Sequence, residues 1–237
     1  YILRWFFASN SGTSMPTQSA ADGTLIHSLA ERFPCGPRSA VMDALEEEIR
    51  AMGVDEGQAA SKIHMDHLRE MASALGEYLE QSTQMGSCAD PNGNVQVEVP
   101  FDVPISSVHI RGRIDRMEAE GQGVRIIDFK TGKKGNKTGA KKDPDHPQLA
   151  LYQLAVEQLG YEVLGAELKY LGYGDVRTIA QDPLDPETRA AWISQLDEIG
   201  QKMKGPSFIA TPSDEACQYC EFARSCPARE QGKRSVE

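Results

Sequence analysis

The stretch GRIDRMEAEGQGVRIIDFKTGKKG, residues 112–135, decides the fold. Two short runs rich in β-branched and aromatic residues, 111–118 and 124–129, flank a segment that contains two glycines. Short apolar runs on either side of a glycine-rich turn are typical of a β-hairpin. Both predicted strands are otherwise patterned for burial, so the charged residues within them need an explanation.

The register of this hairpin brings the charged residues together. A turn centred between Gly121 and Gln122 places Asp115 directly opposite Asp128, with their Cβ atoms about 5 Å apart on one face of the sheet. Side chains alternate along a strand, so Lys130 lies on the same face as Asp128. The sequence therefore predicts two carboxylates and an ammonium group on a single patch.

These three groups suit hydrolysis. Two neighbouring carboxylates repel each other unless a cation lies between them, and Mg²⁺ prefers one or two protein carboxylates with water as its remaining ligands. A lysine beside such an ion can polarise a water molecule or stabilise charge on a phosphoryl oxygen. The pattern predicts a site that hydrolyses phosphodiesters. The alternative is a hairpin with an Asp–Lys surface ion pair, in which Asp115 caps a turn.

Composition sets limits on the class of protein. The chain has 237 residues, of which 40% are hydrophobic and 25% charged, as expected of a globular protein with one large domain or a domain with an appended subdomain. No apolar run approaches the ~20 residues that span a bilayer, and the first residues do not resemble a signal peptide. We expect a cytoplasmic protein without membrane contacts. The net charge of -10 means that nucleic acid could only bind a local basic patch.

One candidate patch follows the Asp-Phe-Lys sequence. Lysines spaced by glycines attract phosphates without regard to base sequence, and glycine lets the backbone come close to a polyanion. The alternative is a solvated, flexible loop. The predicted DNA-binding residues are Lys133, Lys134, Lys137, Lys141 and Lys142.

Periodicity predicts the remaining elements. Helices are expected at 1–8, 22–33 with Asp22 as the N-cap, 39–52, 56–81, from Pro147 to about 159, and 186–204. A loop is expected at 86–94 and strands at 95–103, 107–118, 124–130, 162–172 and 176–180. This order predicts an α/β domain with a mixed sheet whose first three strands form an antiparallel meander.

Five motifs in this order resemble the RecB-type branch of the PD-(D/E)XK nucleases. They are GTLIHSLAE (23–31), GRIDRM (112–117), IIDFKTGK (126–133), HPQLALYQLAV (146–156) and ACQYCEFARSCP (216–227). In particular the chain resembles the C-terminal nuclease domains of actinobacterial helicase-nuclease subunits of the AddB and AdnB kind. The resemblance implies a restriction-endonuclease-like mixed sheet flanked by helices. One integrated domain would comprise a helical part (1–85), a nuclease core (86–210) and a cysteine segment (211–237).

The resemblance also assigns roles to individual residues. It implies that His27, Asp115 and Asp128 bind the metal ion, that the Phe129 carbonyl contacts it, and that Lys130 is the catalytic lysine. Considered alone, His27 lies on an apolar helix face, where a histidine is more often part of the core.

Two residues of the fourth motif are assigned as well. Gln148 and Tyr152 match a Gln-x-x-x-Tyr element; at i and i+4 they share a helix face and could contact DNA or position the lysine. The alternative is that Tyr152 packs in the core.

The five cysteines form a separate pattern. Cys217, Cys220 and Cys226 have the C-x₂-C-x₅-C spacing of zinc or iron–sulfur ligands, and we expect no disulfides in a cytoplasmic chain. The resemblance implies a [4Fe-4S] cluster completed by an upstream cysteine, but Tyr1 stands at that position. Either Cys35 or Cys88 supplies the fourth ligand, or another ligand or zinc substitutes, or no centre forms.

The resemblance implies a DNA nuclease that depends on Mg²⁺ or Mn²⁺. It would act as an exonuclease on single-stranded DNA or duplex ends, beside a UvrD/RecB-like helicase motor in double-strand break repair and recombination. The chain begins inside the first motif element and contains no G-x-x-x-x-G-K-[ST] sequence, so the motor is expected elsewhere in a longer polypeptide or in a partner chain. The alternative is a catalytically silent nuclease fold that binds DNA or docks subunits.

Overall fold

The computed structural model describes most of the chain. The described residues are 18–205 except 56, 90–91, 133–140 and 173, together with positions 210, 212, 213, 217, 220, 226 and 228. The chain divides into two compact units, residues 17–197 and residues 1–16 with 198–237. The helix expected at residues 1–8 lies outside the described residues. The domain boundaries expected at 85 and 210 stay a prediction.

A mixed six-stranded sheet forms the centre of the first unit. Its spatial order is β1-β2-β3-β5-β6-β4; the pairs β3/β5 and β4/β6 are parallel and the others antiparallel. The strands are β1 (Gln96–Ile105), β2 (Val108–Glu120), β3 (Gly123–Lys130), β4 (Lys141–Lys142), β5 (Val163–Tyr170) and β6 (Arg177–Gln181). The predicted α/β fold and its meander of three strands are confirmed; the two-residue strand β4 was not expected.

The central hairpin has the predicted register. Glu120 pairs with Gly123 across the turn, and Arg116 pairs with Ile127 at the other end of the ladder. Gly121 adopts φ +62°, which glycine tolerates because it has no side chain. The next pair in this register is Asp115 with Asp128, one position beyond the last backbone pairing. The two carboxylates therefore lie where the β2/β3 ladder ends.

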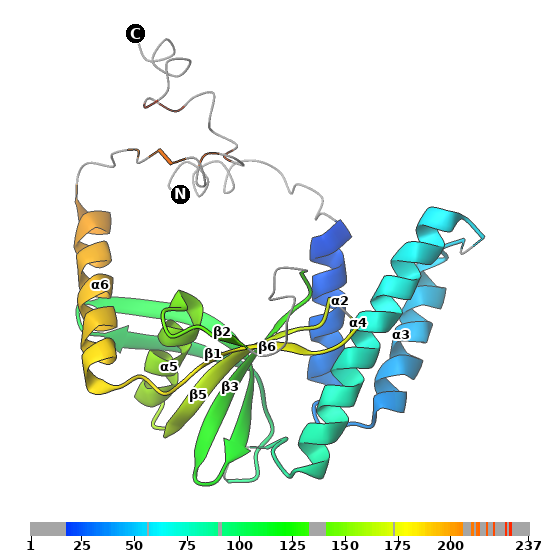
Figure 1. Ribbon diagram of the computed structural model, residues 1–237, viewed down its shortest axis with the longest axis horizontal. Helices are drawn as coiled ribbons and strands as arrows, with labels where there is room; N and C mark the ends of the chain where they lie inside the picture. The colour runs from blue at the N-terminus through cyan, green and yellow to red at the C-terminus, as the bar shows by residue number, and fades with distance from the viewer. Residues whose placement is uncertain are drawn as a thin grey trace. The chain divides into compact units, whose positions relative to one another are not determined.

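Helices cover both faces of the sheet (Figure 1). Three of them pack together over one face with Ile127 and Phe129, and the other two pack over the opposite face with Ile126 and Leu168. Buried side chains on both sides make two hydrophobic cores, and the sheet separates them. The first three helices are α2 (Gln18–Arg32), α3 (Arg38–Met52) and α4 (Ala59–Gln84), and the other two are α5 (Pro147–Gln158) and α6 (Pro186–Lys204).

Two local predictions were wrong. Asp22 is not an N-cap, because α2 begins four residues earlier and the Asp22 carboxylate contacts His64 Nε2 at 2.8 Å. Cys35 and Cys88, 53 residues apart in the sequence, form a disulfide where none was expected. Cys35 follows α2 and Cys88 follows α4, so the packing of these two helices brings the thiols together. No helix among the described residues has the length and apolar character needed to span a membrane.

Candidate active site

Asp128 is the most deeply buried member of the predicted site. It is 2% exposed on β3, and its Oδ1 accepts a hydrogen bond from Gln148 Nε2 at 2.8 Å and a longer one from the Tyr152 hydroxyl at 3.4 Å. Its Oδ2 lies 2.5 Å from Lys130 Nζ in an ion pair and accepts no hydrogen bond from any described residue. The Lys130 ammonium therefore already balances the charge of this buried carboxylate.

Asp115 and His27 come from different layers of the fold. His27 lies on α2 and Asp115 on β2, and His27 Nδ1 is 3.4 Å from Asp115 Oδ2. The same oxygen accepts a hydrogen bond from the Phe129 backbone amide at 2.7 Å, which takes the place of a backbone pairing between β2 and β3. Burial, and secondarily the charge of Asp128, raise the pKa of Asp115 to about 6.

Glu98 is a candidate ligand that the sequence analysis missed. Val97 pairs with Arg116 and Val99 with Ile114, so Glu98 lies opposite Asp115 on β1. Ligand atoms of His27, Glu98 and Asp115 all lie within 4.8 Å of one another.

The backbone at this position is unusual. Glu98 adopts φ +49° inside a strand, a strained conformation for a residue other than glycine, and such strain concentrates at functional sites. A sequence signal did exist for this carboxylate. The turn at Ser106 and Ser107 sets the register of the β1/β2 hairpin, and that register places Glu98 beside Asp115.

A groove runs along α2 beside these ligands. It has a volume of about 500 Å³. Gly23 helps to shape it, because a Cβ at that position would lie only 3.3 Å from Thr131 Oγ1. Small and hydroxyl-bearing side chains from α2 form much of the wall, so an extended ligand can approach the carboxylates from this side. The lining residues are Ser19, Ala20, Gly23, Thr24, His27, Ser28, Glu31, Glu98, Asp115 and Thr131.

Gln148 and Tyr152 lie on the first turns of α5 and both face Asp128. Gln148 Nε2 also donates a hydrogen bond to the Tyr152 hydroxyl at 3.0 Å. Burial, and secondarily the charge of Asp128, raise the pKa of Tyr152 to about 12, so this phenol stays protonated at neutral pH. The two side chains thus orient a carboxylate; among the described contacts, neither touches Lys130.

The chain matches a family of known proteins over most of its length. Residues 2–227 match the PD-(D/E)XK nuclease superfamily. This chain belongs to that superfamily. Its members use divalent metal ions, and the fold predicted from the resemblance is confirmed.

Individual relatives match parts of this nuclease-family chain. Gene 69 protein of Mycobacterium phage L5 is 25% identical over 152 residues, which are 62% of this chain and 49% of the phage protein. An ATP-dependent helicase/deoxyribonuclease subunit of Leuconostoc citreum (strain KM20) is 31% identical over 137 residues, 47% of this chain and 12% of the Leuconostoc protein. The solved structure of SSO0001 is 18% identical, covers 73% of this chain and 79% of its own, and has a TM-score of 0.37. The chain thus spans about half the length of the phage relative.

The residues present fit a divalent ion of the kind that this superfamily uses. The donor set combines the His27 imidazole with the carboxylates of Glu98 on β1 and Asp115 on β2, and oxygen ligands suit Mg²⁺ or Mn²⁺. Asp128, which pairs with Lys130, is not part of this set. The Phe129 side chain is buried on the opposite face against Tyr78, with ring centroids 5.7 Å apart. The metal contact of the Phe129 carbonyl stays a prediction.

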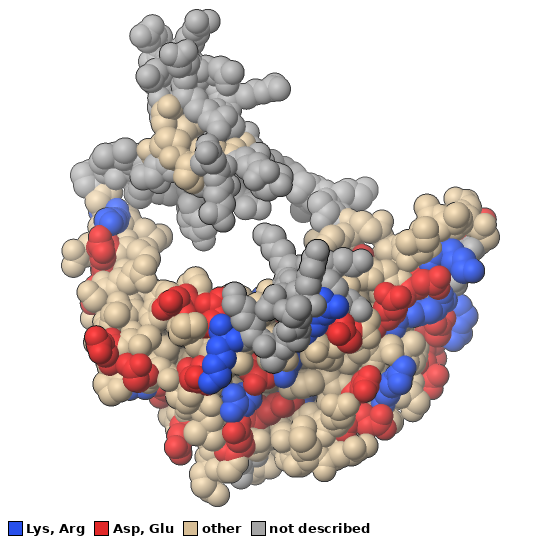
Figure 2. Space-filling view, viewed as in Figure 1, with Lys and Arg blue, Asp and Glu red and all other residues tan. Residues whose placement is uncertain are grey.

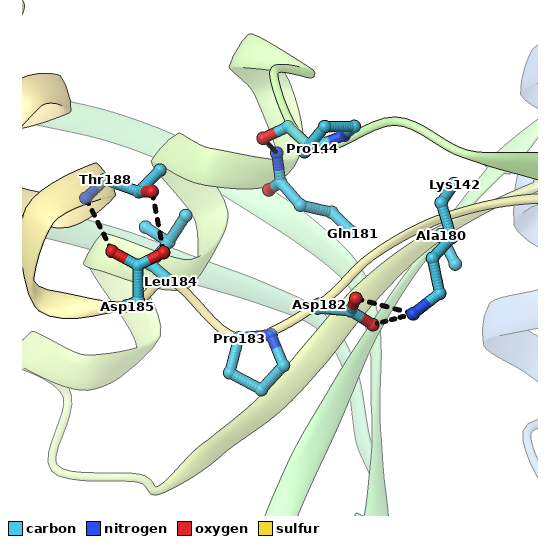
Figure 3. A pocket seen from close by; sticks show the side chains of 9 residues that line it. All are labelled: Lys142, Pro144, Ala180, Gln181, Asp182, Pro183, Leu184, Asp185 and Thr188. Atoms are coloured by element: carbon cyan, nitrogen blue, oxygen red, sulfur yellow. Dashed lines mark hydrogen bonds and ion pairs between the residues drawn. The ribbon is translucent and has the colours of Figure 1, made fainter.

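The predicted DNA-binding lysines are only partly visible. Lys133, Lys134 and Lys137 lie outside the described residues, as does the side chain of Lys141. Lys142 Nζ lies 2.6 and 2.8 Å from the two oxygens of Asp182, so its charge is already paired (Figure 3). Acidic and basic side chains are interspersed over the face shown in Figure 2. DNA binding by this segment stays a prediction.

Figure 3 also shows a second cavity, of about 320 Å³, next to Lys142. Both carboxylates in its wall already have partners within the protein. Asp182 pairs with Lys142, and Asp185 accepts hydrogen bonds from the backbone amide and hydroxyl of Thr188 at the start of α6. These contacts close the strand β4 onto β6 and cap a helix. A structural role accounts for this cavity.

The three C-terminal cysteines are free thiols in this structure. Among the described residues, these three cysteines do not form a cluster in which all ligand atoms lie within 4.8 Å of one another. The cluster of that kind is His27, Glu98 and Asp115. Cys35 and Cys88 are bonded to each other, so neither offers a thiolate as the fourth ligand. A [4Fe-4S] or zinc centre stays a prediction from the spacing of Cys217, Cys220 and Cys226.

Proposed function

We propose that this chain is a nuclease that depends on Mg²⁺ or Mn²⁺ and hydrolyses DNA phosphodiester bonds. The observation that carries the proposal is the convergence of His27, Asp115, Asp128 and Lys130, from α2, β2 and β3, at the point where the central hairpin ladder ends. Glu98 adds a fourth candidate ligand to this set. A catalytically silent fold would have no need for the buried Asp128 carboxylate beside the largely buried Asp115.

Each side chain has a distinct task in this proposal. His27, Glu98, Asp115 and Asp128 would hold the ion, which supplies a Lewis acid and an activated water when bound. Lys130, one-third exposed, reaches from Asp128 toward solvent and can donate a hydrogen bond to a phosphoryl oxygen as negative charge develops there. Gln148 holds Oδ1 of Asp128, which leaves Oδ2 for Lys130 and the ion.

The preferred substrate in this proposal is single-stranded DNA, attacked from an end. The groove beside the ligands is walled mostly by small and hydroxyl-bearing residues of α2, which leaves a DNA strand access to the carboxylates. The match to a subunit of an ATP-dependent helicase/deoxyribonuclease supports action beside a helicase motor, in the same or a partner chain. Double-strand break repair and recombination are the processes in which we propose that it acts.

The test is degradation of a single-stranded oligonucleotide labelled at either end. We expect shortening that requires Mg²⁺ or Mn²⁺, stops with EDTA, and is absent in the Asp128→Ala and Lys130→Ala variants. Lys202→Ala is the matched control, because Lys202 pairs with Glu198 on the exposed surface of α6. Equal cleavage by wild type and Asp128→Ala would contradict the proposal, and binding of DNA without cleavage would favour the silent alternative.

A further inference from the structure

A buried charge network lies directly behind the site, on the opposite face of β2. Arg116 is 1% exposed and the largest fully buried side chain among the described residues. Its Nε lies 2.6 Å from Glu118 Oε1, and its Nη2 donates to Ser82 Oγ at 3.1 Å. Glu118 also accepts hydrogen bonds from Ser82 at 2.7 Å and from the Tyr78 hydroxyl at 2.9 Å. The guanidinium is therefore held rigidly against α4.

The third arm of this guanidinium reaches the end of the His27 helix. Arg116 Nη1 donates to the carbonyl oxygen of Pro34 at 2.6 Å, although the two residues are 82 positions apart. Pro34 follows two residues after α2 ends. Because Arg116 directly follows Asp115, one short piece of β2 contacts His27 on one face and anchors the His27 helix on the other.

Burying these charges costs desolvation free energy, which suggests that the network serves a purpose other than stability. Buried ion pairs often contribute little net stability, since desolvation offsets the attraction between the charges. A planar guanidinium with several fixed donors does provide precise geometry. Metal ligands need that precision, and groups that orient ligands typically change metal affinity about 10- to 100-fold when removed.

We propose that Arg116 is a positioning residue for the metal site. Its guanidinium is fixed by Glu118 and Ser82 and binds the Pro34 carbonyl. This contact fixes the position of α2 along the sheet, so that His27 lies next to Asp115. This inference rests on the proposed function, because it presupposes that His27 is a metal ligand. It predicts that Arg116 acts on the metal through His27 and not through general stability.

The experiment is a double-mutant cycle read out by Mn²⁺ binding, using electron paramagnetic resonance on the full 237-residue chain. Arg116→Lys keeps the charge and loses the three-armed geometry, and we expect it to weaken Mn²⁺ binding about tenfold. In a His27→Ala background the same substitution should weaken binding no further, because its route to the metal is already gone. Arg125→Lys is the matched control. Arg125 on β3 pairs with Glu120 on β2, with Arg125 Nε 2.6 Å from Glu120 Oε2. Its substitution should leave Mn²⁺ affinity unchanged.

Ser82→Ala is a milder second variant. It removes one partner of Arg116 and should weaken Mn²⁺ binding in the same direction, so the test survives if Arg116→Lys does not fold. Wild-type affinity in a folded Arg116→Lys protein would overturn the proposal. Equal weakening with and without His27 would overturn it too, because the effect would then be general. If His27→Ala leaves Mn²⁺ affinity unchanged, or if wild type binds none, the metal assignment itself fails, and the inference fails with it.

Discussion

Two neighbouring parallel strands carry the same acid-x-lysine pattern but place it on opposite faces of the sheet. On β3 the pair is Asp128 and Lys130; on β5 it is Glu167 and Lys169. Ile127 lies beside Glu167, and Asp128 lies beside Leu168. This offset of one residue sends Asp128 toward α5 and the site, whereas Glu167 points to the face covered by α4.

The surroundings of the two pairs differ in kind. Lys169 lies over the Tyr78 ring at 5.2 Å, donates to Thr178 and pairs with Glu167, which also contacts Arg125 at 3.5 Å. These charges are all matched within the fold. Asp128 is paired with Lys130 as well, but its charge also acts on a second carboxylate, Asp115. An acid-x-lysine motif therefore indicates a reactive site only when its face also carries further ligands.

The largest effect expected from this comparison concerns the two lysines. Lys130→Met should lower kcat for oligonucleotide cleavage about 100- to 1000-fold, because it removes the cation that stabilises charge on the phosphoryl group. Lys169→Met should leave kcat unchanged and lower the Tm, because it removes a cation from a packed network. Single-turnover cleavage with Mg²⁺ and thermal denaturation measure the two outcomes. Equal losses of kcat in the two variants would mean that the face of the sheet does not decide whether the lysine of an acid-x-lysine pair is catalytic.

Neutralising one carboxylate on each face should change stability in opposite directions. The pKa of Asp115 is about 6 in the folded protein, against an ordinary value of 3.8, so the folded state binds the proton more tightly than the unfolded chain does. Stability from this group is present below pH 3.8 and is lost as the pH rises to 6 and above. Without metal at pH 8, Asp115→Asn should therefore stabilise the fold by up to about 3 kcal/mol.

On the other face, Glu118→Gln should destabilise the protein by about 3 kcal/mol, since it leaves the buried Arg116 charge without its partner. Urea denaturation in EDTA at pH 4 and pH 8 measures both variants. At pH 4 the advantage of Asp115→Asn should shrink toward zero. A stabilising effect of the same size at both pH values would contradict the assigned cause.

The smallest expected effects concern two glutamines on α5, one of which contacts the site and one of which does not. Gln148→Ala removes a hydrogen bond to Asp128 and should weaken Mn²⁺ binding about tenfold. Gln153→Ala removes buried hydrogen bonds to Gln181 and to the Leu184 amide, and should destabilise the protein by about 1–3 kcal/mol without changing Mn²⁺ affinity. Calorimetric titration and denaturation together test the pair. Loss of affinity in both variants would indicate that α5 acts on the site only as a whole.

Features encoded by nearby residues were predictable from the sequence. The turn at Gly121 set the register that brings Asp115 next to Asp128, and alternation along β3 placed Lys130 with them. Helix and strand order followed from periodicity for the same reason, since each signal lies within a few turns or one hairpin. Glu98 also belonged to this class, because the hairpin at Ser106 places it opposite Asp115.

Contacts between distant segments were decided by the tertiary structure alone. The Cys35–Cys88 disulfide joins positions 53 residues apart, and the hydrogen bond from Arg116 to Pro34 joins positions 82 apart. Neither has a local pattern, because both depend on how α2 and α4 pack over the sheet. The sequence by itself determined which carboxylates and lysine share a face. Only the packing of helices on that sheet decided which distant side chains hold them in place, because burial joins residues regardless of their separation along the chain.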